Sequence, residues 1–224
     1  MTPAYVFAAL TIPLVGLLLL AERRDAPWRV WAKAAASSSF IATAVAAGAA
    51  GTAYGGWVLA ALCLGWAGDI ALVSAQRRWF LLGLAAFLFS HLAYIGAFAT
   101  VQPDAVVAVL VAAGLLVPAG LVARWLWPHL GGDMRVPVAA YIAVITAMVA
   151  AASGAAGGPG PSLPPALSLA GWKATVVVAA VAFYLSDVSV ARDRFVAPGF
   201  GNRIWGLPLY YAAQLLFALS VGMR

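Results

Sequence analysis

The sequence predicts an all-α membrane protein, a bundle of eight transmembrane helices with both termini on the outer side of the membrane. The first reason is composition: 65% of the 224 residues are hydrophobic and only 9% are charged, whereas about 25% of a typical soluble domain is charged. The second is that the apolar residues form eight long runs, and the third is that basic residues gather in alternate loops. Eight spans of ~20 residues would use roughly 160 residues, which leaves no room for a separate soluble domain.

The eight apolar runs follow one another with mostly short connections, so consecutive helices are expected to be antiparallel neighbours. In chain order the runs are Pro3 to Leu20, Trp31 to Ala50, Gly56 to Val73, Trp79 to Thr100, Ala105 to Trp127, Val136 to Ala152, Leu167 to Val190 and Ile204 to Val221. Each is long enough to cross the hydrocarbon layer as a helix. The longest connection, Ser153 to Pro165, is rich in glycine and proline and is predicted to be a flexible outer loop.

The basic residues predict the orientation of these helices. Eleven of the thirteen lie in loops one, three, five and seven or at the adjoining helix ends: Arg23, Arg24, Arg29, Lys33, Arg77, Arg78, Arg124, Arg135, Arg192, Arg194 and Arg203. The opposite face holds Lys173 and Arg224. The positive-inside rule therefore places the odd-numbered loops in the cytoplasm. The first run has its arginines after it, so we interpret it as a retained span and not as a cleaved signal peptide.

Composition also bounds the domain organisation and the partners. The single cysteine, Cys63, lies in an apolar run, so neither an intramolecular disulfide nor a cysteine-based metal site can form. Residues 1–224 are predicted to be one integral membrane domain, and the Ala-rich and Arg-rich chain is typical of a bacterial inner (plasma) membrane protein with no nucleic-acid partner. Gly68-Asp69-Ile70 and Ser186-Asp187-Val188 are similar and each precedes a basic turn, which indicates a weak repeat of two four-helix halves, 1–104 and 105–224.

Few ionisable side chains lie at membrane depth, and these are the informative ones, because such a group costs several kcal/mol unless it is paired or hydrated. Asp69 lies about eight residues before the basic turn that starts at Arg77, or ~12 Å along a helix. Asp187 lies about five residues before Arg192, or ~8 Å. Both helices run toward the cytoplasm, so the two carboxyls are expected at similar depths, and the flexible stem of Lys33 allows it to reach the same level.

Two further runs add polar side chains that can line a cavity together with this layer. They are Ser90, His91 and Tyr94 in the fourth run, and Tyr210 and Gln214 in the eighth, with Asn202 in the loop before the eighth. His91 and Tyr94 share one helix face near the middle of the bilayer, and Tyr210 and Gln214 share another. The small residues from Ala34 to Ser39 are expected to allow close helix packing.

Each of these residues also has a purely structural interpretation. An aspartate near a helix end can pair with a neighbouring arginine, His91 can be a hydrogen-bonded packing residue, and Lys33 can anchor its helix at the headgroups. Two carboxyls at matched depth favour a function, because buried carboxylates without one are hard to explain energetically. The other acidic residues are expected to be solvated and without a role: Glu22, Asp25, Asp104, Asp133 and Asp193.

Together these residues resemble the YhhN/TMEM86 family of membrane proteins. The resemblance covers most of the chain and rests on Lys33, Gly68-Asp69, Phe89-Ser90-His91-Leu92-Ala93-Tyr94, Ser186-Asp187, and Asn202 followed by Tyr210 and Gln214. Ala34 follows the lysine where many members have proline. The resemblance implies an eight-helix lysoplasmalogenase that hydrolyses the vinyl ether bond of lysoplasmenyl-ethanolamine or lysoplasmenyl-choline, releasing a fatty aldehyde and a glycerophospho-alcohol. It also implies that Asp69 and Asp187 are the catalytic pair.

The chemistry of that reaction suits two carboxyl groups. Protonation of the alkene carbon gives an oxocarbenium ion, which water captures as a hemiacetal that collapses to aldehyde and alcohol. As in glycoside cleavage, one carboxylic acid can donate the proton while a carboxylate stabilises the cation or activates water. We expect Asp69 and Asp187 to divide these roles, without an assignment of either. The expected binding and supporting residues are Lys33, which pairs with a carboxylate or meets the substrate phosphate, and Ser90, His91, Tyr94, Ser186, Asn202, Tyr210 and Gln214. No metal or cofactor is expected.

Two other classes of function fit the same residues. A proton-coupled transporter of small molecules or lipids would carry the same buried Asp, His and Lys side chains, although the third and seventh runs lack a Gly-Pro interruption. A non-catalytic membrane protein would use the polar layer only to hold its helices together. The expected partners are a vinyl ether lysophospholipid and membrane lipids, and the sequence selects neither a headgroup nor an oligomeric state.

Overall fold

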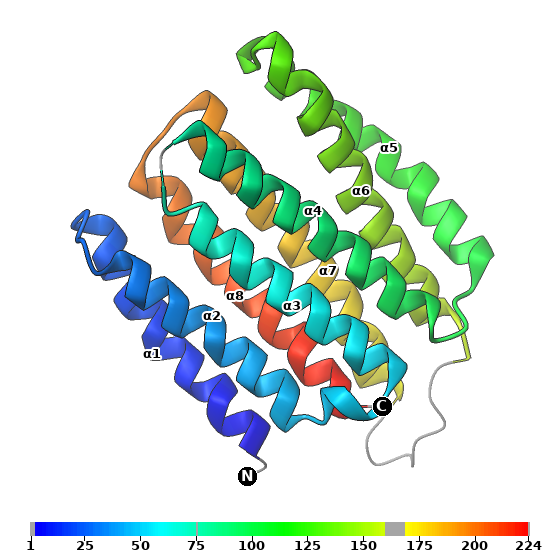
Figure 1. Cartoon of the computed structure of the whole chain (residues 1–224). Helices are drawn as coiled ribbons and strands as arrows, with labels where there is room; N and C mark the ends of the chain where they lie inside the picture. The colour runs from blue at the N-terminus through cyan, green and yellow to red at the C-terminus, as the bar shows by residue number, and fades with distance from the viewer. Residues whose placement is uncertain (1–2, 75, 160–168, 224) are drawn as a thin grey trace.

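The computed structural model describes residues 3–74, 76–159 and 169–223, and this part of the chain forms eight long α-helices and no strand (Figure 1). They are α1 (Pro3–Arg23), α2 (Arg29–Ala46), α3 (Ala53–Ala71), α4 (Arg77–Ala99), α5 (Ala105–Leu126), α6 (Gly132–Gly157), α7 (Leu169–Ala191) and α8 (Phe200–Ser220). Each helix coincides with one predicted apolar run, so the all-α prediction is confirmed. A short π-helix, η3 (Arg192–Val196), continues α7 into the turn before α8.

Seven of these helices are long and apolar enough to cross a membrane, and α2 is the one that falls short. It contains Arg29, Lys33 and the consecutive serines 37–39, which lower its hydropathy. Lys33 and Ser37 are nevertheless buried, and α2 lies between α1 and α3 (Figure 1). Lys33, Ser37, Ser39 and Thr43 of α2 are thus turned toward the bundle, as expected for a helix in a polytopic membrane protein.

Most consecutive helices pack against each other as antiparallel hairpins, with both termini at one end of the bundle (Figure 1). The expectation of neighbouring consecutive helices is wrong for α4 and α5, because α4 packs mainly against α3 and α6, and α5 packs against α6. The turns α1–α2, α3–α4, α5–α6 and α7–α8 lie at the opposite end, which we call the basic end because it carries the eleven basic residues named above. α8 packs against α1, α2, α3 and α7, whereas α5 is peripheral and buries only Leu126. The assignment of the basic end to the cytoplasm and the repeat of 1–104 and 105–224 stay predictions.

Two boundaries differ from the sequence-based prediction. α6 continues to Gly157, so the first residues of the loop predicted from Ser153 are helical. The reason is close packing with α5: a Cβ at Gly154 would lie 2.8 Å from Ala108 Cβ, and the glycine permits this approach. Asn202 lies in the first turn of α8 and not in a loop. The rest of the predicted loop, the start of the seventh run at Leu167, and Arg224 lie outside the described residues.

An aromatic cluster at the centre of the bundle joins α4, α7 and α8. The Phe183 ring centroid on α7 lies 6.2 Å from that of Phe87 and 4.6 Å from that of His91, both on α4. It also lies 5.4 Å from the ring of Tyr210 on α8. These edge-on and tilted contacts are the arrangements that aromatic pairs prefer, and they position the polar residues described next.

Candidate active site

Asp69 on α3 is buried and receives donors from two other helices. Its side chain is 3% exposed, and Lys33 Nζ lies 3.3 Å from Oδ1. Ser37 Oγ donates to Oδ2 at 2.6 Å, and Tyr210 Oη donates to the same oxygen at 2.7 Å. A cation and two hydroxyl donors are the partners that an ionised carboxylate needs away from water.

A chain of hydrogen bonds supports these donors from behind. Gln214 Nε2 donates to Tyr210 Oη at 3.1 Å, and Tyr94 Oη donates to Gln214 Oε1 at 2.6 Å. The hydroxyls of Ser37 and Tyr211 are 3.0 Å apart, and Tyr211 is the donor because Ser37 gives its own proton to Asp69. Each hydroxyl that faces Asp69 is therefore oriented by a second buried group.

Asp187 on α7 has a different environment. Its side chain is 16% exposed, and His91 Nε2 lies 3.6 Å from Oδ2. Tyr141 Oη donates to the same oxygen at 2.7 Å. In the part of the chain that the structure describes, no lysine or arginine nitrogen lies within 4.0 Å of this carboxyl. Asp187 thus has one hydroxyl donor and a neighbouring imidazole where Asp69 has a cation and two donors.

Both carboxyls line one cavity of about 430 Å³ that reaches the basic end. Its wall is formed mainly by α3, α4, α6, α7 and α8, with the first turns of α2 and the last turn of α5 contributing side chains. Charged and polar side chains also line the cavity at the basic end, and most of the remaining wall is apolar, with Leu72, Phe80, Leu84, Leu126, Val138 and Ile142 among its residues. A cavity with polar groups at one part and an apolar wall elsewhere suits an amphiphilic ligand.

The structure brings most of the predicted site residues to this cavity. Those that line it are Asp69, Asp187, Lys33, Ser186, Asn202 and Tyr210. Gln214 and Tyr94 lie behind Tyr210, and His91 lies beside Asp187 and is fully buried. Within the described residues, no three His, Cys, Asp or Glu side chains form a group that could hold a metal ion.

Three predicted residues make hydrogen bonds to groups other than the two carboxyls. Ser90 Oγ donates to the Ala61 carbonyl of α3 at 2.8 Å, which joins α4 to α3. Ser186 Oγ donates to the carbonyl one turn earlier, at 2.7 Å. Asn202 accepts from Arg192 and donates to the Ala197 carbonyl at 2.7 Å, so it closes the turn between α7 and α8.

Sequence reasoning missed several residues of the site. Ser37 was grouped with packing residues, although it lies one turn from Lys33 on the same helix face, a spacing that could have identified it. Tyr141 had no polar neighbour at helical spacing to mark it. Tyr211 was also overlooked, because its contact with Ser37 joins positions far apart in the chain.

The prediction that the remaining acidic residues are solvated is wrong for Glu22. Its side chain is 11% exposed, pairs with Arg203 and lines the cavity. Asp193 also lines the cavity, with Oδ2 3.5 Å from Arg203 Nη2. Asp104 accepts from the Val106 and Val107 amides at 2.8 and 3.1 Å and caps α5. Asp25 and Asp133 form exposed pairs with Arg29 and Arg77.

Two glycines of α3 make this arrangement possible. A Cβ at Gly65 would lie 2.6 Å from Gln214 Nε2, so a larger residue would displace the amide that orients Tyr210. A Cβ at Gly68 would lie 2.7 Å from the ring of Phe87. Glycine before Asp69 therefore lets α4 approach closely enough for the aromatic cluster to pack beside the carboxyl.

Comparison with known proteins agrees with the resemblance seen in the sequence. The profile of the YhhN family matches residues 28–221. A protein of Mycobacterium bovis named lysoplasmalogenase is 37% identical over 175 residues, which cover 71% of this chain and 58% of that protein. Human lysoplasmalogenase TMEM86A is 34% identical over 158 residues, covering 68% of this chain and 60% of the human protein. Pig lysoplasmalogenase TMEM86B is 32% identical over 178 residues, with coverages of 77% and 66%.

The chain spans about 60% of the length of the curated relatives that it matches. No solved structure matches it significantly. The segment matched by the family profile contains α2 to α8 entire, and with them Lys33, both aspartates and the tyrosines that donate to them. The chain is a multi-pass membrane protein, and it belongs to the YhhN family.

Proposed function

We propose that the protein is a lysoplasmalogenase, a membrane-embedded hydrolase that cleaves the vinyl ether bond of lysoplasmenyl-ethanolamine or lysoplasmenyl-choline. The observation that carries this proposal is that two carboxyls in different environments line one amphiphilic cavity. The names of the relatives support it, since three of them from a bacterium, human and pig are called lysoplasmalogenases. The products are a fatty aldehyde and a glycerophospho-alcohol.

The surroundings of the two carboxyls support a division of roles. Asp69, beside Lys33 and two hydroxyl donors, is the ionised carboxylate. Asp187 has one hydroxyl donor, Tyr141, and among the described residues no lysine or arginine nitrogen within 4.0 Å, and a buried carboxyl without a cation is more stable when neutral. Asp187 is therefore the general acid, and Asp69 stabilises the cation and activates water.

The reaction balances with these two groups alone. The Asp187 carboxylic acid transfers its proton to the alkene carbon, and the resulting oxocarbenium ion lies next to the Asp69 carboxylate. Water adds to the cation while Asp69 takes one of its protons, which gives a hemiacetal. As the hemiacetal collapses, its hydroxyl proton returns to Asp187 and the leaving glycerol oxygen takes the proton held by Asp69. General acid and base help of this kind is worth about 100-fold to 10,000-fold in rate.

The proposal is tested by measuring aldehyde release from a vinyl ether lysophospholipid with purified protein in detergent. Wild type should release aldehyde, and Asp69→Asn and Asp187→Asn should each lose nearly all turnover while remaining folded. Asp133→Asn is the matched control, because Asp133 is 55% exposed in a surface pair with Arg77. Folded wild type that releases no aldehyde from ethanolamine or choline substrates would exclude this function, and proton-linked transport would then be tested on the same carboxyls.

The location follows from the same reasoning. We place the protein in the bacterial inner membrane with its basic end in the cytoplasm, as the distribution of arginine favours. The cavity then opens toward the cytoplasmic leaflet, so a lysolipid would reach it from that side.

A further inference from the structure

We propose that Arg29 and Arg194 form a binding site for the phosphate of a single-chain phospholipid at the mouth of the cavity. The mouth is the polar rim at the basic end, lined by Glu22, Arg29, Asp193, Arg194, Asn202 and Arg203. This inference rests on the proposed function for the identity of the lipid, and its test is a binding measurement that does not depend on turnover.

The charges that line the cavity are unevenly matched. Four cations line it: Arg29, Lys33, Arg194 and Arg203. Lys33 is paired with Asp69, and Arg203 is paired with both Glu22 and Asp193. Glu22, Asp69 and Asp193 are thus paired with these two cations, and among the described residues Asp187 has no lysine or arginine nitrogen within 4.0 Å. Arg29 and Arg194 therefore have no carboxylate partner within the cavity wall. Because Lys33 is paired with Asp69, we assign the substrate phosphate to these two arginines and not to Lys33.

Arg29 is placed to reach a phosphate near the carboxyls. It lies four residues before Lys33 on α2, which is one turn on the same helix face and about 6 Å nearer the basic end. That offset matches the short glycerol backbone that separates an ether oxygen from the phosphate. Its present partner, Asp25, is 84% exposed, and exposed ion pairs of this kind are weak and readily exchanged.

Arg194, in η3, lines the same cavity. Its guanidinium carbon lies 4.4 Å from the centroid of the Phe80 ring, and across the described ranges no carboxylate oxygen lies within 4.0 Å of it. A guanidinium stacked on an aromatic face keeps the N–H groups at its edge available for phosphate oxygens. Phe80 itself lines the cavity and begins the apolar wall, so the same contact joins the polar mouth to the part that would take the acyl-like chain.

The rest of the cavity has an apolar wall that suits the chain of the lipid. Beyond Phe80 the wall is formed by apolar side chains of α4 and α6, including Leu84, Phe87, Val138 and Ile142. α6 diverges from α4 toward the basic end (Figure 1). A lysophospholipid with its phosphate at the two arginines would place its ether oxygen near the carboxyls and its chain along this wall.

The test uses a saturated alkyl-ether lysophospholipid, which has no vinyl ether to cleave, and the same alkylglycerol without phosphate. Binding of each to purified protein in detergent is measured by titration for wild type, Arg29→Gln, Arg194→Gln and the double variant. Each substitution should weaken binding of the phospholipid by about tenfold, as expected for loss of a charge-assisted hydrogen bond. Binding of the alkylglycerol should not change.

Arg78→Gln is the matched control, because Arg78 also stacks on an aromatic ring, with its guanidinium carbon 5.7 Å from the centroid of Trp79, but does not line the cavity. Equal losses for both lipids, no loss for the phospholipid, or the same loss in Arg78→Gln would overturn the assignment. Inorganic phosphate in large excess should not displace the phospholipid, since the chain contributes much of the binding, and displacement would instead assign the site to a free anion. A protein that binds the phospholipid through these arginines yet releases no aldehyde keeps this site while the proposed hydrolysis fails.

Discussion

Replacing Lys33 by methionine tests the most demanding feature of the site, a buried charge pair. Lys33 and Asp69 side chains are 10% and 3% exposed, so removal of the cation leaves a carboxylate with little access to water. Breaking a buried ion pair from one side costs about 3 to 5 kcal/mol. The lower value applies here, because Ser37 and Tyr210 still donate to Asp69.

The loss can be read from thermal unfolding in detergent, followed by the fluorescence of the nine tryptophans. For a chain of this length about 3 kcal/mol lowers the Tm by roughly 6 to 12 °C. The control is Lys173→Met. This lysine donates to the Gly158 carbonyl at 2.7 Å, and among the described residues no carboxylate oxygen lies within 4.0 Å of its nitrogen, so its loss should cost only about 1 kcal/mol.

The double variant Lys33→Met/Asp69→Asn separates the charge pair from packing. It removes both charges and should recover most of the Tm lost by Lys33→Met, as a double-mutant cycle on contacting residues requires. If Lys33→Met has the same Tm as wild type, Asp69 is not held as a buried carboxylate. The same conclusion follows if the Tm losses of the two single variants simply add in the double variant. The role assigned to it as the ionised partner would then be refuted.

Three further results are expected. Asp187→Asn should melt within a few degrees of wild type, because no lysine or arginine nitrogen of the described residues lies within 4.0 Å of that carboxyl. A drop as large as that of Lys33→Met would contradict its assignment as a neutral acid. Tyr141→Phe removes the hydroxyl that donates to Asp187 at 2.7 Å. It should lower kcat by about tenfold, because one hydrogen bond to a charged or reacting group usually contributes that much. Unchanged aldehyde release would show that Tyr141 has no part in positioning the acid. Gly65→Ala places a Cβ 2.6 Å from an amide nitrogen of the supporting chain and should cost about 1 to 3 kcal/mol, whereas Gly56→Ala in the same helix meets nothing within 4 Å and should not lower the Tm.

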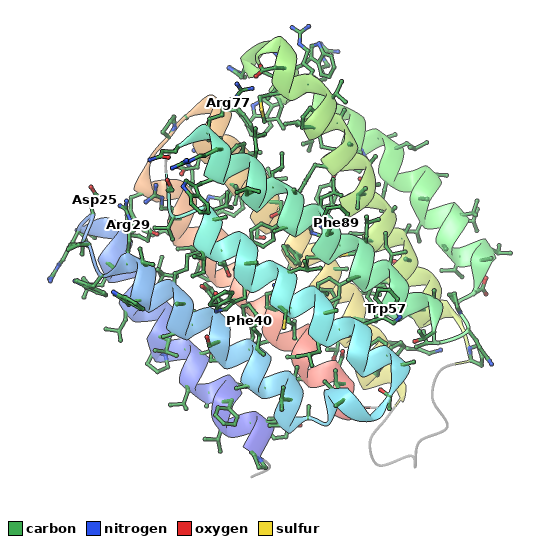
Figure 2. The ribbon with its side chains drawn as sticks, in the orientation of Figure 1. Asp25, Arg29, Phe40, Trp57, Arg77 and Phe89 are labelled. Carbon is green, nitrogen blue, oxygen red and sulfur yellow. The ribbon has the colours of Figure 1, made fainter. Side chains whose placement is uncertain are left out.

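The site around Asp69 depends on the packing of α2 against α8. Figure 2 shows Phe40 of α2 turned into the bundle, while Asp25 and Arg29 lie together at the basic end. Phe40 packs on Tyr210 and Tyr211 of α8, with ring centroids 6.3 and 6.1 Å apart. These contacts join α2 to α8 and thereby bring the Ser37 and Tyr210 hydroxyls to the same carboxyl oxygen of Asp69.

Hydropathy and the positions of charge were sufficient to predict eight helices, their antiparallel order and the layer of Asp69, Asp187 and Lys33. The reason is that these properties act locally: an apolar run must bury its backbone bonds in a helix within the bilayer, and arginine must remain near its surface. They also brought Tyr210 and Gln214 into consideration, because helical spacing places them on one face.

The partners of each carboxyl depended on contacts between helices distant in sequence, which no local pattern encodes. Asp69 meets Lys33 and Tyr210 from α2 and α8, while Asp187 meets Tyr141 from α6. This difference between two similar sequence motifs, Gly68-Asp69 and Ser186-Asp187, exists only after α6 and α8 have packed on opposite sides of the cavity. Helix packing therefore gives one carboxyl a cation and leaves the other without one, because the energy of a buried charge depends on which neighbours surround it.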